Sequence, residues 1–263
     1  MKKALLTGLM FLIALNVKAA VWEANQKWSE YWEVQYAQWV GHDVSKNIFV
    51  DGKTLLSGLP TDCADSLYAI RILFAYENNL PFVMTAPDYF KGKIQFFGND
   101  TTMFDHIKDE RQRVRAFITF IAQEAGTRNL QKDTFPVGIN YINSGTLYLV
   151  QWKKITTGEM VQHSYFVKGA TRDIDLIYYA SDAPVAVRTL NVTVGFPKYT
   201  FSGDPYGYRA WKHPEHLKMP ENLIPKNLGY STEQYSIINK YGPKAGVLEI
   251  NRRIKKRFEA ALR

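Results

Sequence analysis

The chain has 263 residues, of which 46% are hydrophobic and 22% charged, with a formal net charge of +8. This composition is that of a globular protein with enough apolar material for a core, which argues against a disordered chain. No repeat, low-complexity tract or long Gly/Ser linker divides the sequence, so we expect one domain. The positive charge suits anionic envelope polymers, without being specific for them.

Residues 1–19 have the features of a signal peptide. They begin with two lysines, continue as an apolar stretch without acidic residues, and end at the small residue Ala19. The stretch is short for a membrane span of ~20 residues, and no cysteine near the cleavage site could carry a lipid. We therefore expect a periplasmic or secreted protein with no transmembrane span in its mature form. Loss of the three lysines in this segment lowers the formal charge from +8 to +5.

Helices are predicted for most of the first half of residues 20–263. Residues 24–40 carry an aromatic stripe at helical spacing, which favours packing on a core over stacking on a glycan. Residues 47–56 contain a β-branched run followed by Asp51-Gly52, which predicts a strand and a turn. Residues 104–125 show helical apolar spacing again. The stripe consists of Trp28, Trp32, Tyr36 and Trp39.

The apolar period changes to that of strands in the second half. Short β-branched and aromatic runs separated by turn residues predict an antiparallel meander. An irregular Pro- and Gly-rich stretch follows, and residues 249–262 indicate a terminal helix. The predicted architecture is α+β, with a core at about 59–194 and an extension at 195–263. The strand runs are 146–152, 161–167, 176–180 and 185–194.

Cys63 is the only cysteine of the chain. A lone thiol in an exported protein cannot form an internal disulfide, so a reactive role explains it more naturally. Asp62 is suited to cap a helix that begins at Cys63, where the positive end of the helix dipole favours the thiolate. The alternative is a small buried apolar residue, because free cysteines often pack in cores.

A thiol nucleophile requires a base, and His163 is the strongest candidate because it begins an apolar strand in the meander. His163 could instead be a hydrogen-bonded core residue. His42 and His106 lie in polar surroundings. His213-Pro214-Glu215-His216 invites a metal, but Pro214 and the lack of other histidines nearby argue against one. No nucleotide-binding glycine pattern follows a strand, so we expect no cofactor, no metal and no nucleic-acid partner.

A cysteine that opens a helix as Asp62-Cys63, followed 100 residues later by a histidine on a core strand, resembles the papain-like fold of NlpC-type and transglutaminase-like bacterial cysteine hydrolases. The resemblance covers roughly residues 59–194. It implies cleavage of amide bonds, in many members those of peptidoglycan stem peptides or cross-links. Cys63 is then the nucleophile and His163 the base that protonates the leaving amine.

The residue that orients His163 is predicted from hairpin symmetry. If the chain turns at about residues 169–173, the position opposite His163 lies near residues 179–182. Asp182 is our choice, while Ser181 and Tyr179 remain open. Asp175 would lie about four residues further along the strand, ~13 Å away.

The segment 202–229 is predicted to be an ordered loop that walls the cleft, with Arg209 or Lys212 available to a substrate carboxylate. The competing class is a non-catalytic envelope-binding or structural protein. Residues 251–258 are strongly basic and would suit attachment to an anionic wall or membrane surface, as would the aromatic stripe.

Overall fold

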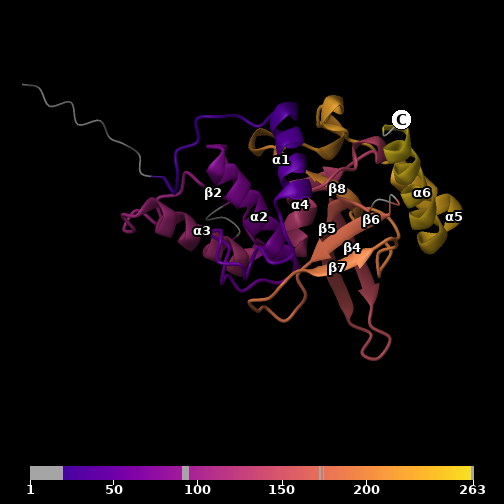
Figure 1. Cartoon of the computed structure of the whole chain (residues 1–263), viewed down its shortest axis with the longest axis horizontal. Helices are drawn as coiled ribbons and strands as arrows, with labels where there is room; N and C mark the ends of the chain where they lie inside the picture. Colours follow the sequence, from indigo (N-terminus) through magenta and orange to yellow (C-terminus); the bar gives the residue numbers. More distant parts are fainter. Residues whose placement is uncertain (1–19, 91–94, 172, 174, 262–263) are drawn as a thin grey trace, which may run out of the picture.

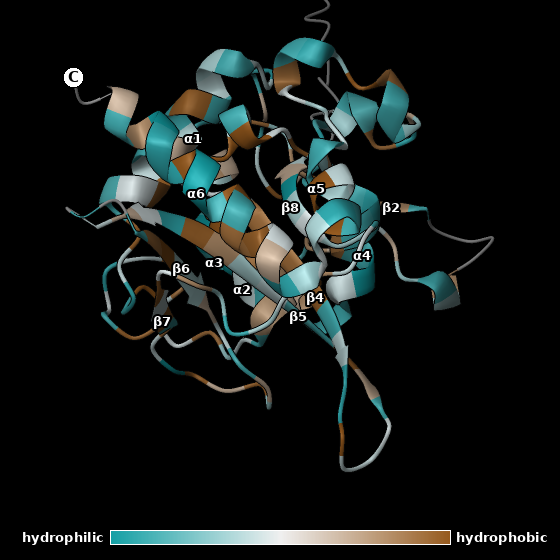
Figure 2. Cartoon of the chain, turned by 90° about the vertical axis from the view of Figure 1, so that its right-hand side faces the viewer, coloured by the Kyte–Doolittle hydropathy of each residue, from teal (hydrophilic) through white to brown (hydrophobic). Residues whose placement is uncertain are grey.

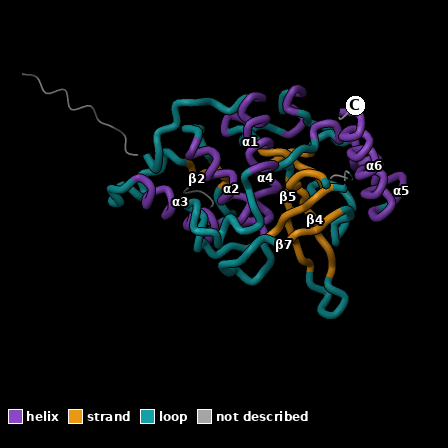
Figure 3. The backbone as a smooth tube through the Cα atoms, in the orientation of Figure 1, coloured by secondary structure: helices purple, strands orange, loops and turns teal. Residues whose placement is uncertain are grey.

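The computed structural model describes residues 20–90, 95–171, 173 and 175–261. The predicted signal peptide lies outside these described residues. The architecture is α+β, as predicted, with helices on both sides of an antiparallel sheet (Figures 1 and 3). Among the described residues, no helix combines the length and apolar character that crossing a membrane requires.

The main sheet has six strands in the order β3-β8-β4-β5-β6-β7, and all its pairings are antiparallel. Its strands are β3 (Thr134–Pro136), β4 (Leu147–Lys153), β5 (Met160–Ala170), β6 (Leu176–Ala180), β7 (Asn191–Val194) and β8 (Gly207–Trp211). A small separate sheet pairs β1 (Val83–Thr85) with β2 (Phe96–Gly98).

Four helices cover one face of the sheet: α1 (Glu30–His42), α2 (Cys63–Glu77), α3 (Glu110–Glu124) and α4 (Thr127–Asp133). The helices α5 (Glu233–Tyr241) and α6 (Pro243–Ala261) cover the other face, and Figure 2 views the molecule from their side. The central strands are therefore buried on both faces, so consecutive side chains along them enter different cores.

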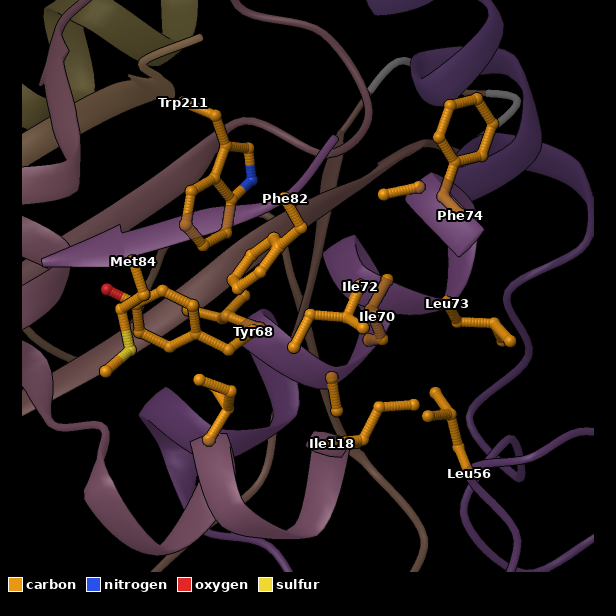
Figure 4. Close-up of a cluster of buried hydrophobic side chains, with 14 of the residues drawn as sticks. Leu56, Tyr68, Ile70, Ile72, Leu73, Phe74, Phe82, Met84, Ile118 and Trp211 are labelled. Atoms are coloured by element: carbon orange, nitrogen blue, oxygen red, sulfur yellow. The ribbon is translucent and has the colours of Figure 1, made fainter. Parts of the chain in front are cut away.

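The alternation along β4 separates the two cores. Leu147 and Leu149 belong to the apolar cluster of α1–α4, whereas Tyr148 and Val150 belong to the cluster of α5 and α6. Figure 4 shows the first cluster around α2, where the ring of Tyr68 meets that of Trp211 from β8 at 5.2 Å. Each face of the sheet thus packs against one layer of helices.

Several predicted boundaries are wrong. Residues 47–56 form turns rather than a strand, and Lys53 N–H donates to the Asp51 carboxylate within them at 3.0 Å. Three predicted elements are shorter than expected, since α1 begins only at Glu30, α3 at Glu110 and β7 at Asn191. The predicted end of the core at residue 194 is also wrong, because β8, which follows it in the chain, lies inside the sheet between β3 and β4. The segment 195–263, which was predicted to be an extension, therefore contributes a strand and buried side chains to the core.

Candidate functional site

The start of α2 forms as its sequence predicts. The carboxylate of Asp62 accepts hydrogen bonds from the backbone N–H groups of Ala64 and Asp65 at 2.9 and 3.2 Å. The Asp65 carboxyl in turn accepts the N–H of Asp62 at 2.9 Å. This reciprocal capping box fixes Cys63 as the first residue of the helix.

The environment of Cys63 holds its thiol neutral. The residue is 7% exposed, and Sγ lies 4.0 Å from Oγ1 of Thr127. Burial raises the pKa of the thiol, the charge of Asp62 raises it further, and polar groups of Ser164 and Thr127 oppose the rise. Burial and the charge of Asp62 therefore oppose the thiolate that the helix dipole was expected to favour.

His163 and Asp182 come together as hairpin symmetry predicts. Nε2 of His163 lies 3.3 Å from Oδ1 of Asp182, and Asn191 Nδ2 donates to the same carboxylate. The imidazole is 8% exposed and contacts the ring of Tyr165 edge-on at 4.5 Å. Burial lowers the pKa of His163, and the nearby charges of Asp182 and Asp62 oppose that shift.

His163 and Ser164 point to opposite faces of the sheet. His163 is paired with Val150, which belongs to the α5–α6 core, whereas Ser164 is paired with Leu149 of the α2 core. Directly paired residues share a face, so Ser164 and not His163 faces Cys63. No hydrogen bond joins Cys63 to His163 among the described residues. The predicted contact between nucleophile and base is absent from this structure.

The alternative orienting residues have other partners. The hydroxyl of Ser181 donates to the carbonyl of Thr61 at 3.0 Å, which ties the strand end to the approach of α2. The ring of Tyr179 packs edge-on against Phe166. Asp175 lies 3.8 Å from Nζ of Lys255. Asp182 is the acidic residue that the fold places beside His163.

Arg209 and Lys212, which were expected to meet a substrate carboxylate, lie on β8 and directly after it. Arg209 is fully buried, donates to the hydroxyl and carbonyl of Thr134 at 2.8 and 2.9 Å, and is paired with Asp204 and Glu221. Lys212 follows β8, and its half-burial lowers the pKa of its ammonium group. Since β4 separates β8 from β5, both cations lie away from Cys63 and His163.

The segment 202–229 is ordered, but as a mixture of one strand and short helices rather than a loop wall. It contains β8 and the 3-10 turns η3 (Pro214–His216), η4 (Glu221–Leu223) and η5 (Lys226–Leu228). Near its start, the hydroxyl of Tyr206 accepts a hydrogen bond from Gln162 Nε2 of β5 at 3.0 Å.

A buried ionic cluster that the sequence analysis missed joins α1 to α2. Arg71 is 3% exposed, lies over the ring of Trp28 with its guanidinium carbon 3.5 Å from the centroid, and donates two hydrogen bonds to Glu33 at 2.6 and 3.1 Å. His213 Nε2 lies 3.0 Å from the same carboxylate. The one sequence signal was a lone arginine inside an apolar helix.

Beside this cluster lies a cavity of about 200 Å³ between α1, the β3–β8 edge of the sheet and η5. Its lining includes aromatic rings, neutral polar side chains and two glutamates, and no lysine or arginine among the described residues. The aromatic residues are Tyr36, Phe135, Tyr141 and Trp211, the neutral polar ones are Asn143, Ser144, Thr146 and Asn227, and the acids are Glu30 and Glu33.

No protein-family model, curated protein or solved structure matches the chain.

Proposed function

We propose that the chain is an exported, non-catalytic envelope-binding protein on a papain-like scaffold, and that the cavity beside α1 holds a neutral, sugar-sized ligand. The observation that carries the proposal is that Ser164, the residue of β5 beside Cys63, and His163 point to opposite faces of the sheet. A cysteine hydrolase needs its base within hydrogen-bond reach of the thiol. The scaffold itself is supported by the order of the Cys63 helix and the antiparallel strands that carry His163.

The lining of the cavity selects the class of ligand. Tyr36, Tyr141 and Trp211 supply apolar ring surface, while asparagine, serine and threonine side chains supply hydrogen bonds to hydroxyl and amide groups. Of the two acids in the lining, Glu33 is paired with Arg71, so the repulsion that an anionic ligand would meet comes from Glu30. About 200 Å³ is below the ~300–1,000 Å³ of pockets for drug-sized ligands, which fits a single sugar unit.

Calorimetric titration with two related sugars tests the proposal. N-acetylglucosamine should bind, and N-acetylmuramic acid should bind at least tenfold more weakly, because it adds a carboxylate next to Glu30. Ala37→Phe, which fills the cavity from α1, should abolish binding, whereas Ala37→Ser should retain it. Binding of neither sugar, or equal binding by both Ala37 variants, would contradict the proposal.

A second candidate is the cysteine hydrolase, favoured by the 3.3 Å contact of His163 with Asp182 and by the position of Cys63 beside the next strand residue, Ser164. In that mechanism the Cys63 thiolate attacks a peptide carbonyl and His163 protonates the leaving amine. Digestion of peptidoglycan by the wild type but not by Cys63→Ser would establish this candidate and refute the binding proposal. The sugar titration does not use the thiol, so the two outcomes are distinguishable.

A further inference from the structure

Three potential metal ligands meet at η3, outside the cavity's aromatic wall. One ligand atom from each of His213, Glu215 and His216 can be chosen so that all three lie within 4.8 Å of one another. His213 is buried, His216 is half-buried and Glu215 is exposed. Two imidazoles and a carboxylate form a donor set that zinc prefers.

The hydrogen bonds of His213 fix which of its ring nitrogens is free. Nε2 lies 3.0 Å from Oε1 of Glu33, a carboxylate that also receives two N–H groups of Arg71. Because this carboxylate acts as acceptor, Nε2 carries a proton, and in the neutral form of the ring, the form that binds metals, Nδ1 presents its lone pair. A carboxylate that holds the distal nitrogen of an imidazole is the usual support of a metal-bound histidine.

That lone pair faces another acceptor. Nδ1 of His213 lies 3.8 Å from Oε1 of Glu215, which is beyond hydrogen-bond distance. Nδ1 of His216 is also buried, and it has no hydrogen-bond partner among the described residues. The two imidazole rings are close to parallel, with centroids 5.5 Å apart. A cation bound between the side chains of His213, Glu215 and His216 would give each of them a partner for its lone pair.

We propose that His213, Glu215 and His216 bind one divalent transition-metal ion of the zinc class, with Glu33 positioning His213. The backbone of the turn is held by a hydrogen bond from His216 N–H to the carbonyl of His213 at 2.8 Å. Ligand atoms around tetrahedral zinc are about 3.3 Å apart when the bonds are ~2.0 Å. The three ligand atoms, now within 4.8 Å of one another, must therefore move closer by up to about 1.5 Å to hold the metal.

Three protein ligands leave the fourth zinc position open to water or to another ligand. His213 also borders the cavity, so metal binding would stiffen one part of its wall. The site does not depend on the sugar ligand, and metal binding is measured without any sugar present. Failure of one proposal therefore leaves the other intact.

The test uses the full mature chain without a histidine tag, stripped of metal and titrated with Zn²⁺ by calorimetry and with Co²⁺ by visible absorption. We expect one Zn²⁺ per chain and the absorption bands of tetrahedral Co²⁺. Glu215→Gln and His216→Ala should each weaken binding at least tenfold, and Glu33→Gln should weaken it ~10–100-fold. His106→Ala, which removes an exposed histidine elsewhere, should bind as the wild type does.

Glu215 is exposed, so Glu215→Gln should fold even if the other variants do not. Circular dichroism of each variant verifies the fold before titration. Absence of stoichiometric Zn²⁺ binding by the wild type would overturn the proposal. Binding that persists unchanged in both Glu215→Gln and His216→Ala would overturn it as well, because the metal would then lie elsewhere.

Discussion

Ser164 occupies the position of β5 that faces Cys63, and its polar groups oppose the rise in the pKa of the thiol. A base at this position would create the thiol–imidazole pair of a hydrolase, whereas a serine hydroxyl cannot take up the proton of a thiol at neutral pH. His163 lies one residue earlier in β5, so it points to the α5–α6 side of the sheet, where it contacts Asp182. The arrangement accounts for a neutral, buried thiol at a helix start.

The carboxyl pair at the start of α2 predicts a pH-dependent stability. Burial and the charge of Asp62 raise the pKa of Asp65 to about 8, from an ordinary value of 3.8. Between these values the folded chain binds more protons than the unfolded chain, so this group's contribution to stability is lost as pH rises from about 4 to 8. Asp65→Asn, which preserves shape, should make the urea midpoint less dependent on pH across that window. An unchanged profile in the variant would show that Asp65 is ionised when folded.

Removal of one partner of the α1–α2 ion pair should be costly. Burial raises the pKa of Glu33, but the charge of Arg71 and the hydrogen bonds from His213 and Arg71 outweigh it and lower the pKa to about 2. Arg71→Met should reduce the free energy of unfolding by about 3 kcal/mol, because it removes the cationic partner of the Glu33 carboxylate, whose side chain is only 30% exposed. Adding Glu33→Gln should recover part of that loss. Urea unfolding measures both, and a change below about 1 kcal/mol for Arg71→Met would contradict the account.

A hydroxyl cluster attaches α6 to the sheet. The hydroxyl of Tyr208 lies 2.7 Å from that of Tyr178 and donates to Oδ1 of Asn251 at 2.7 Å, with both tyrosines fully buried. Tyr208→Phe should therefore destabilise the fold by about 1–2 kcal/mol, since it leaves buried polar atoms unpaired. Tyr141→Phe is the matched control, because Tyr141 is 47% exposed and should tolerate the loss of its hydroxyl. Equal stability of the two variants would show that the cluster contributes nothing.

The parts of the fold that depend on local signals were predictable. Asp62 caps α2, so its start at Cys63 was predicted to the residue. Asp182 was found beside His163 because a hairpin pairs residues symmetrically about its turn. Extending the observed pairing of Phe166 with Tyr179 by three residues leads to that position.

The face of His163 could not be predicted from the sequence. Residues around His163 in β5 are buried on both sides, so apolar side chains occupy consecutive positions and the alternation does not show which side α2 covers. A shift of one residue exchanges the faces. The contact between Glu33 and His213 joins positions 180 residues apart, and no local pattern encodes it.

The alkylation rate of Cys63 tests the central claim most directly. Iodoacetamide is applied at pH 6 and pH 8 to the folded wild type, to His163→Ala and to the wild type unfolded in guanidinium, and the modified thiol is quantified by mass spectrometry. Because the folded thiol is buried and its pKa is raised, we expect it to react at least tenfold more slowly than the unfolded chain at both pH values, with no effect of His163→Ala. Folded Cys63 that reacts faster than the unfolded control at pH 6, and slows in His163→Ala, would contradict the account.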